Sequence, residues 1–217
     1  PAAVDAGHGR LDRRMNREAN DLRRMAHVGE AGQDLVALCL EGAVVEVGLH
    51  RYATVRPTDF VLPEGGVGIR IGDTPLAKEQ RLRQIKIPAA QAFVRANSLD
   101  RALLAGKTKR LGVVVSGQAA RDVFEALAAM GLTPEMAADL GVSIFKVAMP
   151  WRLEPQAITK FCRGMERVLV IEHKRAVVEP QLKAILYHLA DGERPIVEGK
   201  RDRDGAPLLS DIASLST

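Results

Sequence analysis

The feature of this sequence that most constrains its fold is a regular alternation of short apolar runs with helix-forming segments from residue 107 onward. Leu111–Val115, Val142–Val147 and Val168–Ile171 are mostly apolar runs of strand length, and each is followed by apolar residues at helical spacing. Strands buried on both faces are typical of parallel sheets covered by helices. The pattern therefore predicts an α/β fold with a mainly parallel sheet and helices on both faces. Arg194–Lys200 contains a proline and charges, which favours an edge strand.

Prolines mark several predicted helix starts. A capping residue precedes proline in Asp73-Thr74-Pro75, which predicts a helix to about Arg83. Pro88 predicts the start of a second helix, and Thr133-Pro134 and Pro155 predict two more within the α/β region. We accordingly expect three regions. These are an arm and tail of a preceding region over residues 1–57, a helical connector over 58–106, and the α/β domain over 107–217.

Composition excludes several classes of protein. The net charge is +4, but acidic and basic residues are interspersed and only 4% of residues are aromatic, which argues against a nucleic-acid-binding surface. Cys39 and Cys162 are isolated, so they form neither a zinc nor an iron–sulfur motif and fit a reducing compartment. No run of about 20 apolar residues is present, and a cytoplasmic protein is expected. Pro1 and Thr217 suggest a piece of a longer protein.

Candidate functional residues follow the predicted strands, because the carboxyl ends of parallel strands line the ligand-binding edge of such sheets. Ser116-Gly117 lies where a helix N-terminus offers free N–H groups, but it lacks both the dinucleotide and the P-loop glycine patterns. A tight strand-to-helix turn is the favoured interpretation. Trp151, between two prolines, is expected to bury its indole or to contact a partner, with subunit or domain packing favoured over ligand binding.

Glu172-His173-Lys174 is the polar cluster best suited to acid–base chemistry, because a histidine beside a carboxylate can relay a proton. Adjacent side chains often point in different directions, however. A solvated or interface charge cluster is therefore favoured over a catalytic one. No complete active site is evident, and no catalytic, cofactor-binding or metal-binding residue is assigned.

A set of short segments carries a resemblance to a known family. In order, the segments are Val61-Leu62-Pro63, Gly65-Gly66, Ile69-Arg70, Asp73-Thr74-Pro75-Leu76, Gly112–Ala119, Lys146–Trp151, Leu153-Glu154-Pro155, Val168–Arg175 and Gln181-Leu182-Lys183. From about Asp59 to Leu208 the sequence resembles the indolepyruvate ferredoxin oxidoreductase family, in its transketolase C-terminal-like region. The resemblance implies a Rossmann-like three-layer α/β domain of a large thiamine-diphosphate enzyme.

Such enzymes oxidatively decarboxylate aryl 2-oxoacids, form the acyl-coenzyme A product and reduce ferredoxin through iron–sulfur clusters. The family's Gly-Asp-Gly motif and downstream Asn pair, which hold the diphosphate and its Mg²⁺, are absent here, and Gly72-Asp73-Thr74 is only a partial match. Where the family commonly has Glu-Glu-Lys, this chain has Glu172-His173-Lys174. The resemblance thus implies that thiamine diphosphate, Mg²⁺, iron–sulfur clusters and coenzyme A bind outside this chain.

These observations lead to a main hypothesis and two alternatives. The main hypothesis is a structural, interface-forming domain of an indolepyruvate ferredoxin oxidoreductase that is inactive alone, with the enzyme's other domains, a second copy and ferredoxin as partners. One alternative is an independent module that binds a phosphate or coenzyme A ligand at Ser116, Trp151 and Glu172. The other is an interaction protein that uses residues 1–30.

Overall fold

The computed structural model describes residues 54–68, 70–212 and 215. By its internal contacts the chain divides into two units, residues 1–52 and 53–217, and all described residues belong to the second unit. The prediction that residues 1–30 form an interaction surface lies outside the described residues. The division into regions 1–57, 58–106 and 107–217 stays a prediction. None of the helices in the described residues is long and apolar enough to cross a membrane.

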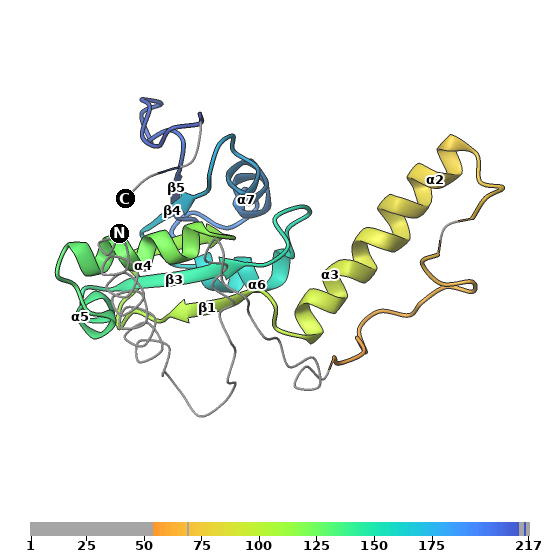
Figure 1. Ribbon diagram of the computed structural model, residues 1–217, viewed down its shortest axis with the longest axis horizontal. Coiled ribbons are helices and arrows are strands. Elements are labelled where there is room, and N and C mark those ends of the chain that lie inside the picture. Colours follow the sequence, from red (N-terminus) through yellow and green to blue (C-terminus); the bar gives the residue numbers. More distant parts are fainter. Residues whose placement is uncertain (1–53, 69, 213–214, 216–217) are drawn as a thin grey trace, which may run out of the picture. The chain divides into compact units, whose positions relative to one another are not determined.

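After residue 110, each strand is separated from the next by one or two helices (Figure 1). The described elements are α2 (Pro75–Arg81), the π-helix η2 (Leu82–Lys86), α3 (Ile87–Ala96), β1 (Arg101–Leu104), β2 (Leu111–Ser116), α4 (Ala119–Ala129), α5 (Pro134–Asp139), β3 (Val142–Val147), α6 (Pro155–Cys162), β4 (Arg167–Ile171), α7 (Val178–Leu186) and β5 (Ile196–Glu198).

The strands form one five-stranded sheet with the order β1-β3-β2-β4-β5. β2 pairs in parallel with β3 and β4, and β5 extends the parallel part at one edge. The register places Val113 opposite Ile144 on one side and Leu169 on the other. The predicted α/β class and the edge position of β5 are therefore confirmed. β1, which is antiparallel to β3 at the other edge, was not predicted, because four residues carry too little periodicity to indicate a strand.

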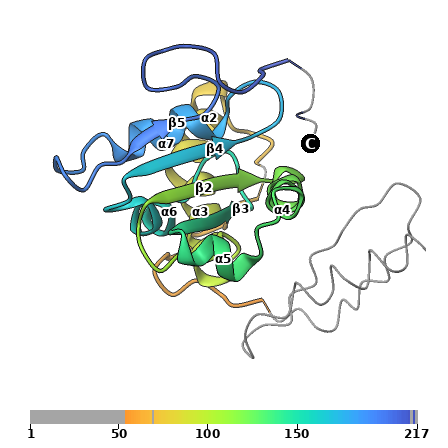
Figure 2. The same cartoon turned by 90° about the vertical axis from the view of Figure 1, so that its left-hand side faces the viewer.

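Helices lie on both faces of the sheet (Figure 2). Alternating side chains of the strands build two cores, one on each face. Val114 packs with residues of α6 and α7, whereas Val113 and Val115 pack with residues of α4 and α5. This alternation explains why the strands are apolar throughout: both faces are covered by helices. The three-layer arrangement predicted from the sequence is confirmed.

Helix starts follow the predicted proline positions. Thr74 and Thr133 each accept a hydrogen bond from a backbone N–H of the following helix, and a proline occupies the first turn of α2 and α5. Proline is tolerated there because the first-turn N–H has no partner within the helix. Glu154 takes the same capping position before Pro155 in α6.

The helix before the sheet differs from its prediction. α3 begins at Ile87, next to the predicted start at Pro88, but no break separates it from α2. The π-helix η2 joins the two, with the N–H of Ile87 donating to the carbonyl of Leu82, five residues earlier. A wider turn ahead of a proline accommodates its missing N–H without ending the helix. Phe93 on this helix is 39% exposed, whereas Ala92 is buried.

Candidate functional site

The loops after β2, β3 and β4 meet at the carboxyl edge of the parallel strands. The connection from β2 to β3 runs through α4 and α5 on one face, and the connection from β3 to β4 runs through α6 on the other. The direction of winding therefore reverses between β2 and β4. In open α/β sheets the crevice at this switch point is the usual ligand position. A ligand is therefore expected first in the crevice flanked by Gly117 and His173.

The turn at Ser116 and Gly117 is fully explained by its local structure. Ser116 is the last residue of β2, and Gly117 has a φ of 56°, a left-handed conformation that glycine adopts without strain. The backbone then turns directly into α4, with the N–H of Arg121 donating to Gln118. Asp122 places a carboxylate in the first turn of α4, which disfavours an anion there. These observations support a tight turn.

Glu172 is buried and acts as the cap of α7. Its side chain is only 4% exposed, and both carboxylate oxygens accept hydrogen bonds from backbone N–H groups. The donors are Val177, Val178 and Glu179, at 2.9, 2.9 and 3.1 Å. The expectation of a solvated or interface charge cluster therefore does not hold for Glu172. Its lone pairs are occupied in holding the loop after β4 against the helix, because buried first-turn N–H groups need an acceptor.

His173 has other contacts than that carboxylate. The Nδ1 atom of His173 accepts a hydrogen bond from the N–H of Leu215 at 3.0 Å, which assigns the proton of the neutral ring to Nε2. Nε2 lies 3.0 Å from Oδ2 of Asp122, although the contact lacks hydrogen-bond geometry. Lys174 is exposed, with a φ of 58°. The three adjacent residues thus do not converge on one reacting group.

The loop after β3 is held at its start by a buried carboxylate. Asp100, just before β1, is 7% exposed and accepts hydrogen bonds from the N–H groups of Ala148 at 2.7 Å and Met149 at 3.4 Å. Burial raises the pKa of Asp100 above its ordinary value, although the two backbone N–H groups act in the opposite direction. The loop is therefore fixed to the edge strand.

The same loop is held at its end by two glutamines. Gln181 of α7 donates to the carbonyl of Pro150 at 2.9 Å and accepts from the N–H of Leu153 at 3.2 Å. Gln91 of α3 donates to the carbonyl of Leu153 at 2.7 Å. Between these anchors Trp151 is 56% exposed, and the Arg152 guanidinium lies 5.6 Å from the centre of its ring. The loop therefore presents the indole to solvent from a rigid support.

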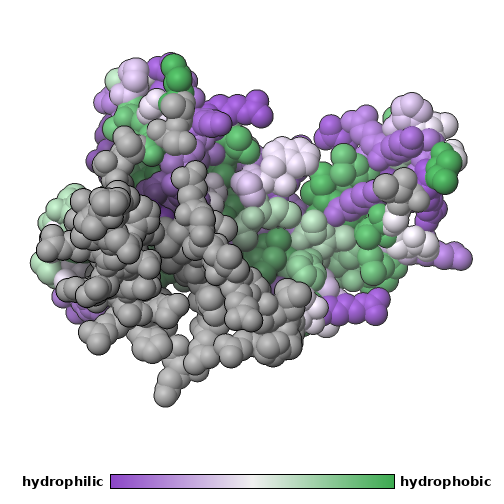
Figure 3. Space-filling model, viewed as in Figure 1, coloured by the Kyte–Doolittle hydropathy of each residue, from purple (hydrophilic) through white to green (hydrophobic). Residues whose placement is uncertain are grey.

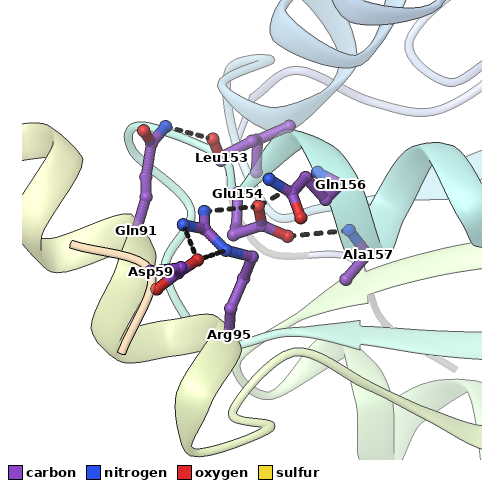
Figure 4. Close-up of polar contacts among 7 residues, drawn as sticks. All are labelled: Asp59, Gln91, Arg95, Leu153, Glu154, Gln156 and Ala157. Atoms are coloured by element: carbon purple, nitrogen blue, oxygen red, sulfur yellow. Dashed lines mark hydrogen bonds and ion pairs between the residues drawn. The ribbon is translucent and has the colours of Figure 1, made fainter. Parts of the chain in front are cut away.

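Glu154, immediately after this loop, is the most buried charged residue of the site (Figure 4). It accepts hydrogen bonds from Gln156 N–H and Ala157 N–H at 3.0 and 2.7 Å, and it pairs with Nη1 of Arg95 at 3.0 Å. The same guanidinium donates through Nε to Asp59 at 2.9 Å. Figure 4 shows Arg95 lying between the two carboxylates. We call this ion pair network the latch, because it joins α3 and the preceding loop to α6.

The latch was missed by sequence reasoning. The signal for the cap was present, since Glu154 directly precedes Pro155 at a helix start. Arg95, in contrast, comes from an element 59 residues away in sequence, and nothing in the local pattern indicates the pairing. Long-range partners of this kind are decided by packing.

Two hollows in the described surface lie along α6. One of about 630 Å³ is lined by Lys109, Pro155, Gln156, Thr159, Lys160 and Arg163. A second of about 250 Å³ lies between α3 and α6 and includes Asp100 and Glu154 in its wall. Ser116, Trp151 and Glu172 line neither of these two hollows.

Metal and cluster chemistry does not fit the residues that are described. No group of three or more His, Cys, Asp or Glu side chains within residues 54–68, 70–212 and 215 is arranged to hold a metal ion. Cys162 is buried in the core, and burial raises the pKa of its thiol to about 12, which disfavours the thiolate needed for metal ligation. The thiolate ligands of an iron–sulfur cluster are therefore not assembled in this part of the chain.

Comparison with solved structures finds distant similarity. One is a split-gene transketolase, an inactive β4 tetramer, with a TM-score of 0.32, 14% identity, and coverage of 47% of this chain and 32% of that chain. Another is the 2-oxoglutarate:ferredoxin oxidoreductase of Magnetococcus marinus, solved with 2-oxoglutarate, coenzyme A and succinyl-CoA bound. Its TM-score is 0.32 at 19% identity, with coverage of 62% of this chain and 22% of that chain. The chain thus spans about a third and about a fifth of these proteins.

Comparison at the level of sequence is more specific. No curated protein matches the chain. Residues 100–209 match the model of the indolepyruvate ferredoxin oxidoreductase middle domain, which is half of the sequence. The matched range includes every strand of the sheet, the Trp151 loop and both capping glutamates. The resemblance found in the sequence is confirmed, and the chain belongs to the indolepyruvate ferredoxin oxidoreductase family.

Proposed function

We propose that this chain is a structural, interface-forming part of a thiamine-diphosphate-dependent 2-oxoacid:ferredoxin oxidoreductase that acts on indolepyruvate or another aryl 2-oxoacid. In this proposal the α/β domain supports the thiamine-binding domains and contributes to a subunit interface. It does not supply the reacting groups, so the isolated chain is inactive. The family assignment of residues 100–209 supports the enzyme class.

One observation carries the structural role: the carboxylates along the loops of the carboxyl edge are already used to hold the fold. Glu172 caps α7, Glu154 caps α6, and Asp100 ties down the loop after β3. A general acid or base needs an atom free to reach a substrate proton. The oxygens of a capping carboxylate are held by backbone N–H groups and lack that freedom. Such groups make the domain rigid, which suits a support for neighbouring domains.

The cofactors belong to other parts of the parent enzyme in this proposal. Thiamine diphosphate with Mg²⁺ would supply carbanion stabilisation, iron–sulfur clusters would carry the electrons to ferredoxin, and coenzyme A would accept the acyl group. The exposed Trp151 on its rigid loop supports contact with a neighbouring domain or subunit, because aromatic residues at such positions commonly anchor interfaces. We further propose a reducing cytoplasm, which the free, buried Cys162 supports.

Isothermal titration calorimetry tests this division of roles. When thiamine diphosphate with Mg²⁺ is titrated into the purified chain, we expect no heat of specific binding. The groups that bind this cofactor lie on other domains in the proposal. Saturable binding at micromolar concentration would overturn the proposed structural role. A parallel titration with coenzyme A tests the independent binding module, and Ser116→Asp is its matched variant, since a new carboxylate at the turn would repel a phosphate.

A further inference from the structure

The loop and helix that precede the sheet leave many large apolar side chains in solvent. We call residues 54–68 and 70–96 the arm, a name that from here on does not refer to the predicted region 1–57. The arm comprises the loop and the continuous helix α2–η2–α3. Ile71, Val61 and Leu76 are 99%, 89% and 75% exposed. Other exposed large apolar residues of the arm are Val55, Leu62, Val67, Leu82 and Phe93. Figure 3 shows hydrophobic residues gathered over the α2–α3 helix.

The first half of the arm helix, α2 and η2, lacks the packing that normally stabilises a helix, whereas α3 buries Ala92 and Val94. Neither α2 nor η2 contains a buried residue, and their main contacts with other elements lie within the helix itself. In globular proteins most helical stability comes from burying one face against a neighbour. Apolar side chains removed from water contribute about 25 cal/mol per Å², so covering the arm is strongly favoured. The arm therefore has the properties of a surface that another protein covers.

The arm is nevertheless held in a defined conformation. Its base is fixed by the latch, in which Arg95 bridges Asp59 and the buried Glu154. Farther along, Arg81 pairs with Asp73 at 2.7 Å, and each of these side chains is only 14% exposed. A surface fixed before binding avoids much of the entropy lost on association. Such preorganisation distinguishes the arm from an unstructured linker.

Charge indicates the chemistry of the partner. The arm has seven basic and four acidic residues. Three of the acids are already paired within the chain: Asp59 with Arg95, Asp73 with Arg81, and Glu79 with Arg83. The charges left without a partner among the described residues are therefore mainly basic, and Lys78 and Lys86 lie on the helix itself. Electrostatic complementarity favours a surface with carboxylates around its apolar centre.

Two other occupants fit the arm less well. Two copies of the arm would bring like charges together, which destabilises a symmetric contact. An anionic membrane suits a helix with one apolar stripe and a basic face, whereas here the exposed apolar residues are shared between the loop and the helix. A protein surface that contacts both is the better fit.

We propose that the arm is the docking surface for another part of the parent enzyme, which presents an apolar face bordered by Asp and Glu side chains. This inference rests on the proposed function only for the identity of the partner. The arm, rather than the Trp151 loop alone, is then the main surface through which this chain joins the assembly.

Site-specific cross-linking in the intact parent enzyme tests this inference. A photoreactive p-benzoylphenylalanine replaces Ile71 or Leu76 in the arm, and in the control it replaces Met130, which is also apolar and 65% exposed but lies after α4. The arm positions are expected to form cross-links to one peptide that contains several carboxylates, and the position at Met130 is not. Absence of arm cross-links, cross-links between two arms, or cross-links to lipid would each overturn the inference.

The identity of the cross-linked peptide separates the two proposals. A peptide from another domain or subunit of a 2-oxoacid oxidoreductase supports both. A carboxylate-rich peptide of an unrelated protein supports the arm as a docking surface and overturns the proposed function. Arm positions that do not react in an enzyme that retains its activity overturn the docking surface and leave the proposed function intact.

Charge reversal provides a second readout. The Lys78→Glu, Lys86→Glu double variant is expected to reduce the cross-link yield from position 76 by about fivefold, because it places like charges at the contact. Lys174→Glu, at the carboxyl edge of the sheet, is the matched control and is expected to leave the yield unchanged. An unchanged yield in the double variant would overturn the acidic character of the partner. Circular dichroism of both variants checks that the helices are intact.

Discussion

The arm and the α/β domain of this chain differ in the burial of their large apolar residues. The domain buries the apolar side chains of β2, β3 and β4 on both faces of the sheet, under helices that the sequence itself supplies. The arm exposes residues of the same types, such as Ile71 and Leu76. The difference teaches that the domain has the core of an independent folding unit, whereas the arm is complete only when another surface covers it.

The latch is an ion pair network that connects these two regions, and its removal is the largest effect we expect. Glu154→Ala removes the cap of α6 and leaves Arg95 without its buried partner, which should lower the free energy of unfolding by about 3–5 kcal/mol. Urea denaturation followed by circular dichroism measures this loss. Glu79→Ala, which removes an exposed pair with Arg83, should cost less than about 0.5 kcal/mol. Equal losses in the two variants would contradict the latch.

A matched pair of leucine substitutions tests the comparison directly. Leu182 of α7 is fully buried, and Leu182→Ala should destabilise the chain by about 2–5 kcal/mol through lost burial and a residual cavity. Leu76→Ala, on the arm, should change the free energy of unfolding by less than about 0.5 kcal/mol, because its side chain is 75% exposed. Similar losses at both positions would mean that the arm is packed in the isolated chain.

Glu172→Gln distinguishes a capping carboxylate from a solvated one. A glutamine keeps one acceptor oxygen but replaces the other with an N–H₂ donor, which would face the backbone N–H groups at the start of α7. The expected loss of stability is about 1–2 kcal/mol, measured by urea denaturation. Lys174→Ala, at the exposed neighbouring position, is the control and should have little effect. If Glu172→Gln caused no loss of stability, that result would contradict the structural role assigned to this carboxylate.

The smallest expected effect is a pH dependence from Asp100. Burial raises its pKa in the folded state above the ordinary value of 3.8, so the folded chain binds this proton more tightly than the unfolded chain does. The contribution of Asp100 to stability therefore decreases as pH rises from about 3.8 through the folded pKa. Asp100→Asn keeps an acceptor for Ala148 and lacks this titration. The difference in unfolding free energy between the native chain and the variant should thus decline with rising pH, and a constant difference would contradict it.

Local patterns predicted a large part of the fold for identifiable reasons. The strands β2, β3 and β4 were evident as apolar runs, and Thr74-Pro75 and Thr133-Pro134 marked helix starts, because capping and proline preferences act within one turn. β1 was missed, since an edge strand of four residues is defined by its pairing with β3. The continuity of the arm helix was missed as well, because the π-turn before Pro88 has no short sequence signature.

The sequence predicted where the candidate site lies, but it did not predict the chemistry of the site. Ser116 is the last residue of β2, and Trp151 and Glu172 follow β3 and β4 at the same edge. Whether Glu172 is a free carboxylate or a cap depends on where α7 begins relative to β4, and periodicity does not determine that geometry. The structural interpretation proposed for these residues rests on that tertiary detail.

By itself the sequence determined the α/β class and the family. Both depend on local patterns, namely apolar runs, helix caps and short motifs that follow one another in a fixed order. Only the tertiary structure decided which carboxylates are occupied and which apolar residues remain uncovered. Glu154 meets Arg95 across 59 residues of sequence, and Ile71 stays in solvent because no described element packs over it. Hydrogen bonding and burial depend on distance in space, and chain order constrains that distance only weakly between elements far apart.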